Sequence, residues 1–191
     1  STWSGVARGL HWMIAAAVLV QLWAGATFDA LDIYDPADIE VYKAWMPLHK
    51  SLGLTILALM LVRWWWRATH PVPALPADVP AWQRIIAGWH HRTLYALLLV
   101  QPVLGLAQSS AYGAKTMFWG VVRVPSIVPP EWSRPVTDVV RKGAQDLHAW
   151  VGWALALLIS VHVAAALYHH FARQDGILLR MLTGRQPGGA S

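Results

Sequence analysis

The 191-residue sequence contains no cysteine, only three phenylalanines and few charged residues, which make up 13% of the chain. Without cysteine the chain forms no disulfide, holds no iron–sulfur cluster and attaches no haem covalently through a C-x-x-C-H motif. The chain has ten Asp and Glu residues and fifteen Lys and Arg residues, which gives a formal net charge of +5. With 56% hydrophobic residues, the chain is too apolar for an ordinary soluble domain. The composition therefore favours a membrane protein.

Four apolar segments are each long enough to cross roughly 30 Å of hydrocarbon as a helix. They cover residues 10–28, 48–66, 89–107 and 147–171. Too little chain remains outside them for a second domain. We predict an all-α, integral membrane four-helix bundle that forms a single domain over residues 1–191.

Charge predicts the orientation of this bundle. If the spans alternate, both termini and the connection between the second and third spans share one side, which carries eight arginines against only Asp78 and Asp175. The other side carries seven Lys and Arg, several of them far into a long loop, where the positive-inside rule weakens. Both termini are therefore expected in the cytoplasm. The excess of basic residues reflects this topology, so nucleic acid is not expected as a partner.

Two connections on the opposite side stand out. Residues 29–47 form an acidic segment, and residues 109–146 form the longest connection. Within the latter, Ser133 can cap and Pro135 can open a short surface helix over residues 136–142. A connection this long is usually functional or a docking surface.

His148 and His162 lie fourteen residues apart in the unbroken hydrophobic run 147–171. Fourteen helical steps bring both imidazoles to one face, roughly 21 Å apart along the axis. Ionisable rings inside a bilayer are costly and need partners. Two haems, one towards each membrane surface, would supply them.

Depth in the membrane selects the partners of these two histidines. The second and fourth spans enter from the same side, so His49 matches His148, and both begin an L-H-x-x-x-G motif that ends at Gly53 and Gly152. Each glycine lies one turn beyond its histidine, where it either clears a porphyrin plane or allows close helix packing. For His162, the opposite side offers His11 or His91, and spacing alone leaves this choice open.

The sequence resembles the bacterial cytochrome b561 family over nearly its whole length. The resemblance rests on G-L-H-W around His11, P-L-H-K-S-L-G around His49, the stretch W-H-H-R-T-L-Y-A-L-L-L-V-Q-P-V-L-G, and the long run L-H-A-W-V-G-W-A-L-A-L-L-I-S-V-H-V-A-A-A-L-Y-H-H-F followed by L-L-R-M-L. It implies two haem b groups held by His11 with His162 and by His49 with His148, which leaves His91 a supporting role.

The resemblance also implies a place and a reaction. Such proteins lie in the bacterial inner membrane and exchange electrons with the quinone pool, and some oxidise superoxide to oxygen while reducing ubiquinone. Others serve as cytochrome b subunits of periplasmic dehydrogenases or hydrogenases.

A third class of function is a haem-free transporter that uses histidines as a proton relay. Such a transporter would show no haem spectrum.

Three further residues are candidates for ligand contacts. His169 lies seven residues after His162 on the same face, where it can hold a quinone carbonyl. Lys50 adjoins His49 and can attract superoxide or pair with a haem propionate. Arg8 can pair with a haem propionate on the inner side or simply anchor the end of the first span.

Overall fold

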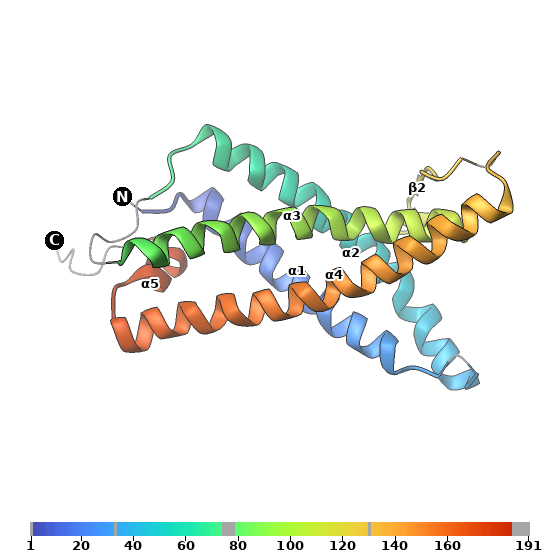
Figure 1. Ribbon diagram of the computed structural model, residues 1–191, viewed down its shortest axis with the longest axis horizontal. Coiled ribbons are helices and arrows are strands. Elements are labelled where there is room, and N and C mark those ends of the chain that lie inside the picture. The colour runs from blue at the N-terminus through green and yellow to red at the C-terminus, as the bar shows by residue number, and fades with distance from the viewer. Residues whose placement is uncertain (1, 33, 74–78, 130, 185–191) are drawn as a thin grey trace.

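The computed structural model describes residues 2–32, 34–73, 79–129 and 131–184, and it confirms a membrane-type bundle of helices (Figure 1). Within these described residues, four helices are long and apolar enough to cross a membrane. They are α1 (Gly5–Ala30), α2 (Pro36–Thr69), α3 (Ala81–Ala111) and α4 (Arg134–Tyr168). A π-helical turn η1 (His169–Arg173) and a short helix α5 (Ile177–Leu182) follow α4. A small hairpin of β1 (Thr116–Phe118) and β2 (Val122–Val124) lies at the opposite end from α5.

Helices α1 and α2 begin earlier than the apolar segments because polar residues cap them. Ser4 Oγ accepts a hydrogen bond from Ala7 N at 3.2 Å, so α1 starts at Gly5 and His11 lies well inside it. Asp35 Oδ1 accepts from Ala37 N at 2.8 Å, and Pro36 then opens α2. Most of the acidic segment 29–47, expected as a connection, is therefore helical.

The short surface helix expected over residues 136–142 is not separate, and that prediction was wrong. Ser133 and Pro135 do start a helix, but it continues without a break to Tyr168. Between residue 142 and the apolar run the sequence offers only Gly143 as a breaker, and one glycine costs a helix only about 1 kcal/mol. The connection between α3 and α4 shrinks accordingly to residues 112–133.

The hairpin in this connection is fixed to the bundle. Its turn places Trp119 at φ 50° and Gly120 at φ 72°, the left-handed pair that a tight hairpin turn requires. Trp119 N donates to Ser51 Oγ at 3.0 Å, and Trp119 Nε1 donates to Thr55 Oγ1 at 3.2 Å. Both acceptors belong to α2, so the hairpin covers one end of the bundle.

The buried core is small and lies between α1 and α2. Ile14, Val18, Ile56 and Met60 form it, and residues from α3 and α4 pack against it. Many large apolar side chains point outward instead. In a membrane the outward-facing side chains of the four spans meet lipid.

Candidate functional site

His49 on α2 and His148 on α4 face each other near the hairpin end of the bundle. Their ring centroids lie 6.1 Å apart, and the ring planes cross at 78°. His148 Nδ1–H donates to the backbone oxygen of Gln101 at 3.0 Å. The Gln101 side chain in turn donates from Nε2 to the His148 backbone oxygen at 2.9 Å. Because this fixes the proton of His148 on Nδ1, its Nε2 is left as a free electron-pair donor.

His49 is held in a related but incomplete way. Gln21 on α1 donates from Nε2 to the His49 backbone oxygen at 2.9 Å. The His49 Nδ1 atom, however, is buried and has no hydrogen-bond partner among the described residues. The edge of the Phe28 ring lies against the imidazole, with centroids 5.4 Å apart. The two histidines of this pair therefore differ: His148 Nδ1 has a hydrogen-bond partner, and His49 Nδ1 has none among the described residues.

The glycines of the L-H-x-x-x-G motifs make room for these glutamines. A Cβ at Gly53 would lie 3.1 Å from Gln21 Nε2, and one at Gly152 would lie 3.3 Å from Gln101 Nε2. In both cases the nearest group is the amide that holds the histidine carbonyl. Close packing between helices is thus the role for these glycines that the structure supports directly.

A third glycine touches the imidazole itself. A Cβ at Gly105, on α3, would lie 3.0 Å from His148 Cε1 and 3.3 Å from its Nδ1. Ordinary carbon contacts begin at about 3.5 Å, so any side chain there would displace the ring. Gln101 and Gly105 together form a cradle for His148.

Sequence reasoning missed these residues, although an internal repeat marks them. The motif L-V-Q-x-x-x-G occurs at residues 19–25 on α1 and at residues 99–105 on α3. His11 and His91 each stand ten residues before the glutamine of their motif. On α2 and α4, the residues fourteen positions after His49 and His148 are Arg63 and His162. The hairpins α1–α2 and α3–α4 are thus variations on one pattern.

Because the repeat gives His11 and His91 equivalent positions, both belong to a second cluster of histidines at the other end of the bundle. The His162 ring has three histidine neighbours, at centroid distances of 6.2 Å for His11, 5.3 Å for His91 and 5.8 Å for His90. His91 Nδ1–H donates to the Ala87 oxygen of its own helix at 2.6 Å. The structure therefore brings His11 and His162 together, and His91 with them.

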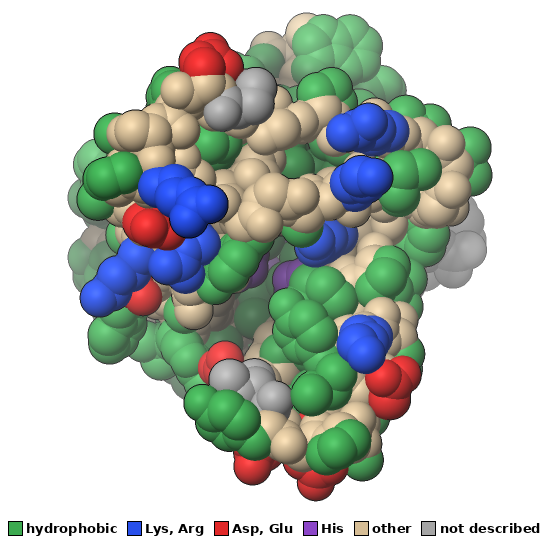
Figure 2. All heavy atoms as spheres, turned by 90° about the vertical axis from the view of Figure 1, so that its right-hand side faces the viewer, with side chains coloured by type: hydrophobic (Ala, Val, Ile, Leu, Met, Phe, Trp, Pro, Cys, Tyr) green, Lys and Arg blue, Asp and Glu red, His purple; other side chains and the backbone are tan. Residues whose placement is uncertain are grey.

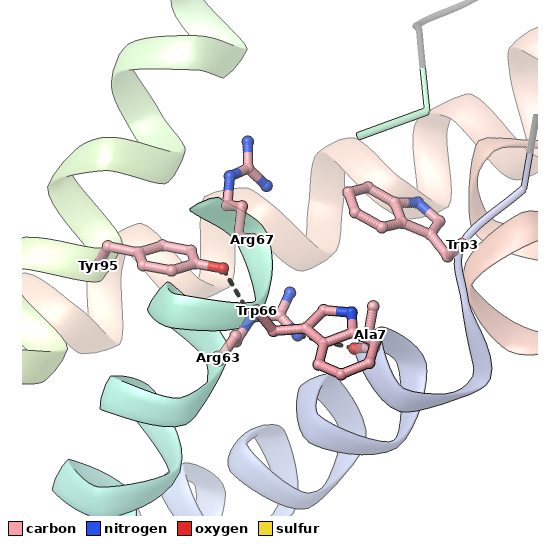
Figure 3. Close-up of a pocket in the computed structure, with 6 residues that line it drawn as sticks. All are labelled: Trp3, Ala7, Arg63, Trp66, Arg67 and Tyr95. Atoms are coloured by element: carbon pink, nitrogen blue, oxygen red, sulfur yellow. Dashed lines mark hydrogen bonds between the residues drawn. The ribbon is translucent and has the colours of Figure 1, made fainter. Parts of the chain in front are cut away.

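Arg63 lines an open pocket beside this cluster (Figure 3). Its Nε donates to Tyr95 Oη at 2.8 Å, and its Nη1 donates to the Ala7 oxygen at 2.9 Å. The guanidinium of Arg67 lies over the Tyr95 ring, 5.8 Å from its centroid. Trp3 and Trp66 complete the lining. Two guanidinium groups make the pocket suitable for an anionic group.

The remaining candidate residues lie at the two ends. Lys50 Nζ donates to Ser109 Oγ at 2.9 Å, and Ser109 is hydrogen-bonded to Thr116 of the hairpin. The Arg8 guanidinium lies against Gly184, where an added Cβ would clash with it, and Arg8 Nε is buried without a partner among the described residues. His169 ends α4 and opens η1, and its Nδ1 is hydrogen-bonded to the Asp175 carboxylate.

Figure 2 shows the hairpin end of the molecule face on. Histidine side chains are visible at the bottom of a hollow, and Lys and Arg side chains gather around its mouth. Acidic side chains lie at the top and bottom of this face, and others lie among the basic side chains on the left and close below the hollow.

The ring separations of the two main histidine pairs are compatible with a metal ion between the rings. An imidazole nitrogen binds a transition metal at about 2 Å, so two rings on opposite sides of one metal have centroids roughly 6 Å apart. The observed distances are 6.1 Å for His49 and His148 and 6.2 Å for His11 and His162. Ligation by two imidazoles from facing helices is a known way to hold haem in a four-helix bundle.

A helical membrane bundle with paired histidines at two depths defines the class of membrane-bound b-type cytochromes. A family model described as prokaryotic cytochrome b561 matches residues 2–184. The chain belongs to this family, which implies binding of b-type haem and electron transfer in a bacterial membrane.

Individual relatives agree with this assignment. The chain is 30% identical over 178 residues to cytochrome b561 homolog 2 of Escherichia coli (strain K12), covering 93% of the chain and 89% of the relative. It is 30% identical over 184 residues to cytochrome b562 of Cereibacter sphaeroides, covering 92% of each. It is 26% identical over 178 residues to the probable superoxide oxidase CybB of Yersinia pestis, covering 91% of the chain and 92% of the relative.

Proposed function

We propose that this protein carries two haem b groups and exchanges electrons between the periplasmic side and the quinone pool of the bacterial inner membrane, with both termini in the cytoplasm. His49 and His148 hold the outer haem, and His11 and His162 hold the inner haem. The observation that carries the proposal is the nearly equal separation of the two ring pairs, 6.1 Å and 6.2 Å. Since His148 and His162 share one continuous helix, the two sites lie roughly 21 Å apart along it.

The choice of His11 over His91 as the inner ligand has geometric support. The separation of His11 and His162 nearly equals that of the outer pair, whereas His91 lies closer to His162, at 5.3 Å. By the internal repeat, the partner of His91 would stand at position 63, where the chain has arginine. His91 keeps a supporting role beside the inner site.

When bound, each haem supplies reversible one-electron chemistry. Two imidazole ligands leave no open position on the metal, which favours electron transfer over direct oxygen binding. The residues around the sites keep the ligands in place: Gln101 fixes the tautomer of His148, and Gln21 holds the backbone of His49. Arg63 and Arg67 provide positive charge for propionates at the inner end.

Superoxide is the electron donor that the outer face favours. Lys and Arg side chains surround the hollow that leads to histidines, and Lys50 lies next to His49. The name of the Yersinia relative points the same way. Two superoxide anions each lose one electron to become oxygen, and one ubiquinone gains both electrons and two protons.

The alternative is a cytochrome b subunit that passes electrons between a periplasmic dehydrogenase or hydrogenase and quinone. The connection 112–133 favours it, because it presents Val121 at 80% exposure together with Val122 and Ile127 beyond the membrane-spanning helices. Exposed apolar side chains outside the bilayer suit a protein partner.

Two measurements test the proposed function. A reduced-minus-oxidised spectrum of the purified protein, with pyridine haemochrome quantification, is expected to give two haem b per chain. No haem would leave only the haem-free transporter. Stopped-flow mixing with superoxide is then expected to reduce the haem rapidly. If reduction is slow and a dehydrogenase co-purifies instead, the subunit function replaces the oxidase.

A further inference from the structure

The chain after α4 folds back sharply to bury one carboxylate against His169. The helix changes to the π-helical turn η1 at His169, and Gln174 and Gly176 follow with φ 52° and 72°. A left-handed conformation at a residue other than glycine, such as Gln174, costs roughly 1 kcal/mol or more. Single π-helical turns and strained residues gather at functional sites. This turn has both features.

Asp175 lies between the two left-handed residues and is almost completely buried. Its side chain is 3% exposed, and that of His169 is 18% exposed. One carboxylate oxygen, Oδ2, is bonded to His169 Nδ1, and the other, Oδ1, accepts from Ile177 N at 3.1 Å. Asp175 N also donates to the His169 backbone oxygen at 3.4 Å. The same residue therefore starts α5 and holds the imidazole.

The charge context makes this carboxylate unusual. Asp175 and Asp78 are the two acidic residues on the side of the sequence that carries eight arginines. The other ionisable side chains of η1 and α5 are His170, Arg173 and Arg180. The His169–Asp175 pair therefore lies on the side of the bundle where arginines outnumber acidic residues, roughly 10 Å along the helix axis from His162. A buried carboxylate–imidazole pair there fixes which nitrogen of His169 carries a proton.

We propose that His169 and Asp175 form the proton-donating pair for a quinone at the inner end of the bundle, with Asp175 as the positioning residue. This inference rests on the proposed function, which supplies quinone as the electron acceptor. Reduction of one quinone takes two electrons, delivered singly by the b-type haem, and two protons. One proton leaves His169 Nε2 as an O–H bond forms on a quinone carbonyl oxygen. The second proton comes from water.

Asp175 determines which form of His169 remains after this transfer. Protonated His169 loses the Nε2 proton and becomes the neutral imidazole with its proton on Nδ1, still donated to the carboxylate. Its Nε2 lone pair then regains a proton from cytoplasmic water. With asparagine at 175, Oδ1 can still accept from Ile177 N, but the amide nitrogen faces His169 Nδ1. The neutral ring then favours the opposite tautomer, with Nε2 protonated.

The test uses the haem-loaded protein and four forms of it: native, Asp175→Asn, His169→Ala and the control His170→Ala. Haem is reduced first, and its reoxidation by a short-chain ubiquinone is followed by stopped flow in H₂O and D₂O. General acid catalysis contributes about 10²-fold or more, so Asp175→Asn is expected to slow the maximal rate by about 10²-fold with KM little changed and with a larger solvent deuterium effect. His169→Ala is expected to be at least as slow. His170→Ala is expected to keep the native rate, because the His170 ring packs on Phe171.

A readout independent of turnover is the ¹⁵N NMR spectrum of histidine-labelled protein. In its neutral form, which remains after the proton transfer, the His169 ring is expected as the Nδ1–H tautomer in the native protein and as the Nε2–H tautomer in Asp175→Asn. If Asp175→Asn keeps native reoxidation and the native tautomer while His169→Ala is slow, Asp175 has no such role and the quinone site stands. If His169→Ala is as fast as the native protein, quinone does not bind at His169. The quinone contact at His169 and the proton-donating pair with Asp175 then both fail. Loss of haem or helicity in Asp175→Asn, with the per-haem rate unchanged, would make the role of Asp175 structural and overturn the inference.

Discussion

Gln101 and His148 are joined by two reciprocal hydrogen bonds. The His148 ring donates to the Gln101 backbone oxygen at 3.0 Å, and the Gln101 side chain donates to the His148 backbone oxygen at 2.9 Å. The two helices α3 and α4 are thereby fixed in register at the outer histidine pair. The equivalent residues Gln21 and His49 make only the second of these bonds. The ring of His148 is therefore anchored, whereas that of His49 is oriented by packing.

Gly105→Ala should disturb the outer haem selectively. The new methyl group would lie 3.0 Å from His148 Cε1 and push the ring away from the Gln101 oxygen. Loss of such a supporting hydrogen bond typically weakens metal binding by about 10- to 100-fold. The matched control is Gly25→Ala, at the same position of the repeat on α1, where a Cβ has nothing within 4 Å. Both changes gain the same helix propensity, so haem content and the low-spin EPR signal isolate the contact. Equal spectra for the two variants would contradict the cradle.

Single histidine replacements should remove one haem each. His148→Ala takes away an outer ligand and leaves the inner pair intact, and His162→Ala does the reverse. The haem-to-protein ratio is expected to fall from two to one in each variant, and redox titration is expected to show the loss of a different component in each. His91→Ala is the informative control, because its loss should shift the inner component without abolishing it. Two haems retained in His148→Ala would refute the pairing.

The sequence predicted the histidine arrangement well because helical geometry is regular. A spacing of fourteen residues places His148 and His162 on one face whatever surrounds them, and matching depth pointed to His49. Spacing could not decide between His11 and His91, since the repeat puts both at the same depth. The asymmetry that distinguishes them is Arg63, whose role depends on contacts with Ala7 and Tyr95 from two other helices.

Helix ends were predicted less well, for a local reason. Apolar runs mark what lies in hydrocarbon, but capping by Ser4 and Asp35 decides where α1 and α2 start, and α4 starts at Arg134, directly before Pro135. The fold-back that brings Asp175 to His169 depends on the left-handed residues Gln174 and Gly176, for which the hydrophobic pattern gives no signal. Such a turn becomes visible only in three dimensions.

Lys50→Gln should slow the reaction with superoxide if that anion is the donor. The change removes one positive charge beside His49 while an amide can still donate to Ser109. The second-order rate constant for haem reduction is expected to fall several-fold at low salt, and the difference should shrink above about 0.1 M salt, where charges are screened beyond about 10 Å. Lys43→Gln is the control, because Lys43 is paired with Glu40 on the exposed start of α2. A loss of outer haem in Lys50→Gln would instead indicate a propionate partner.

Ser51→Ala should release the hairpin from the bundle. The Ser51 hydroxyl is buried, accepts from Trp119 N at 3.0 Å and donates to the Pro47 oxygen at 2.9 Å. Removing it leaves the Trp119 amide without its acceptor, which costs about 1–3 kcal/mol, and the left-handed Trp119 adds to the tendency to open. Hydrogen exchange and limited proteolysis are expected to increase at residues 116–124 while the spans stay protected. Ser160→Ala is the control, because this exposed serine bonds only within its own helix, to Ala156. If superoxide reacts faster in Ser51→Ala, the hairpin restricts access to the outer histidines; an unchanged rate with a mobile hairpin would show that the hollow is already open.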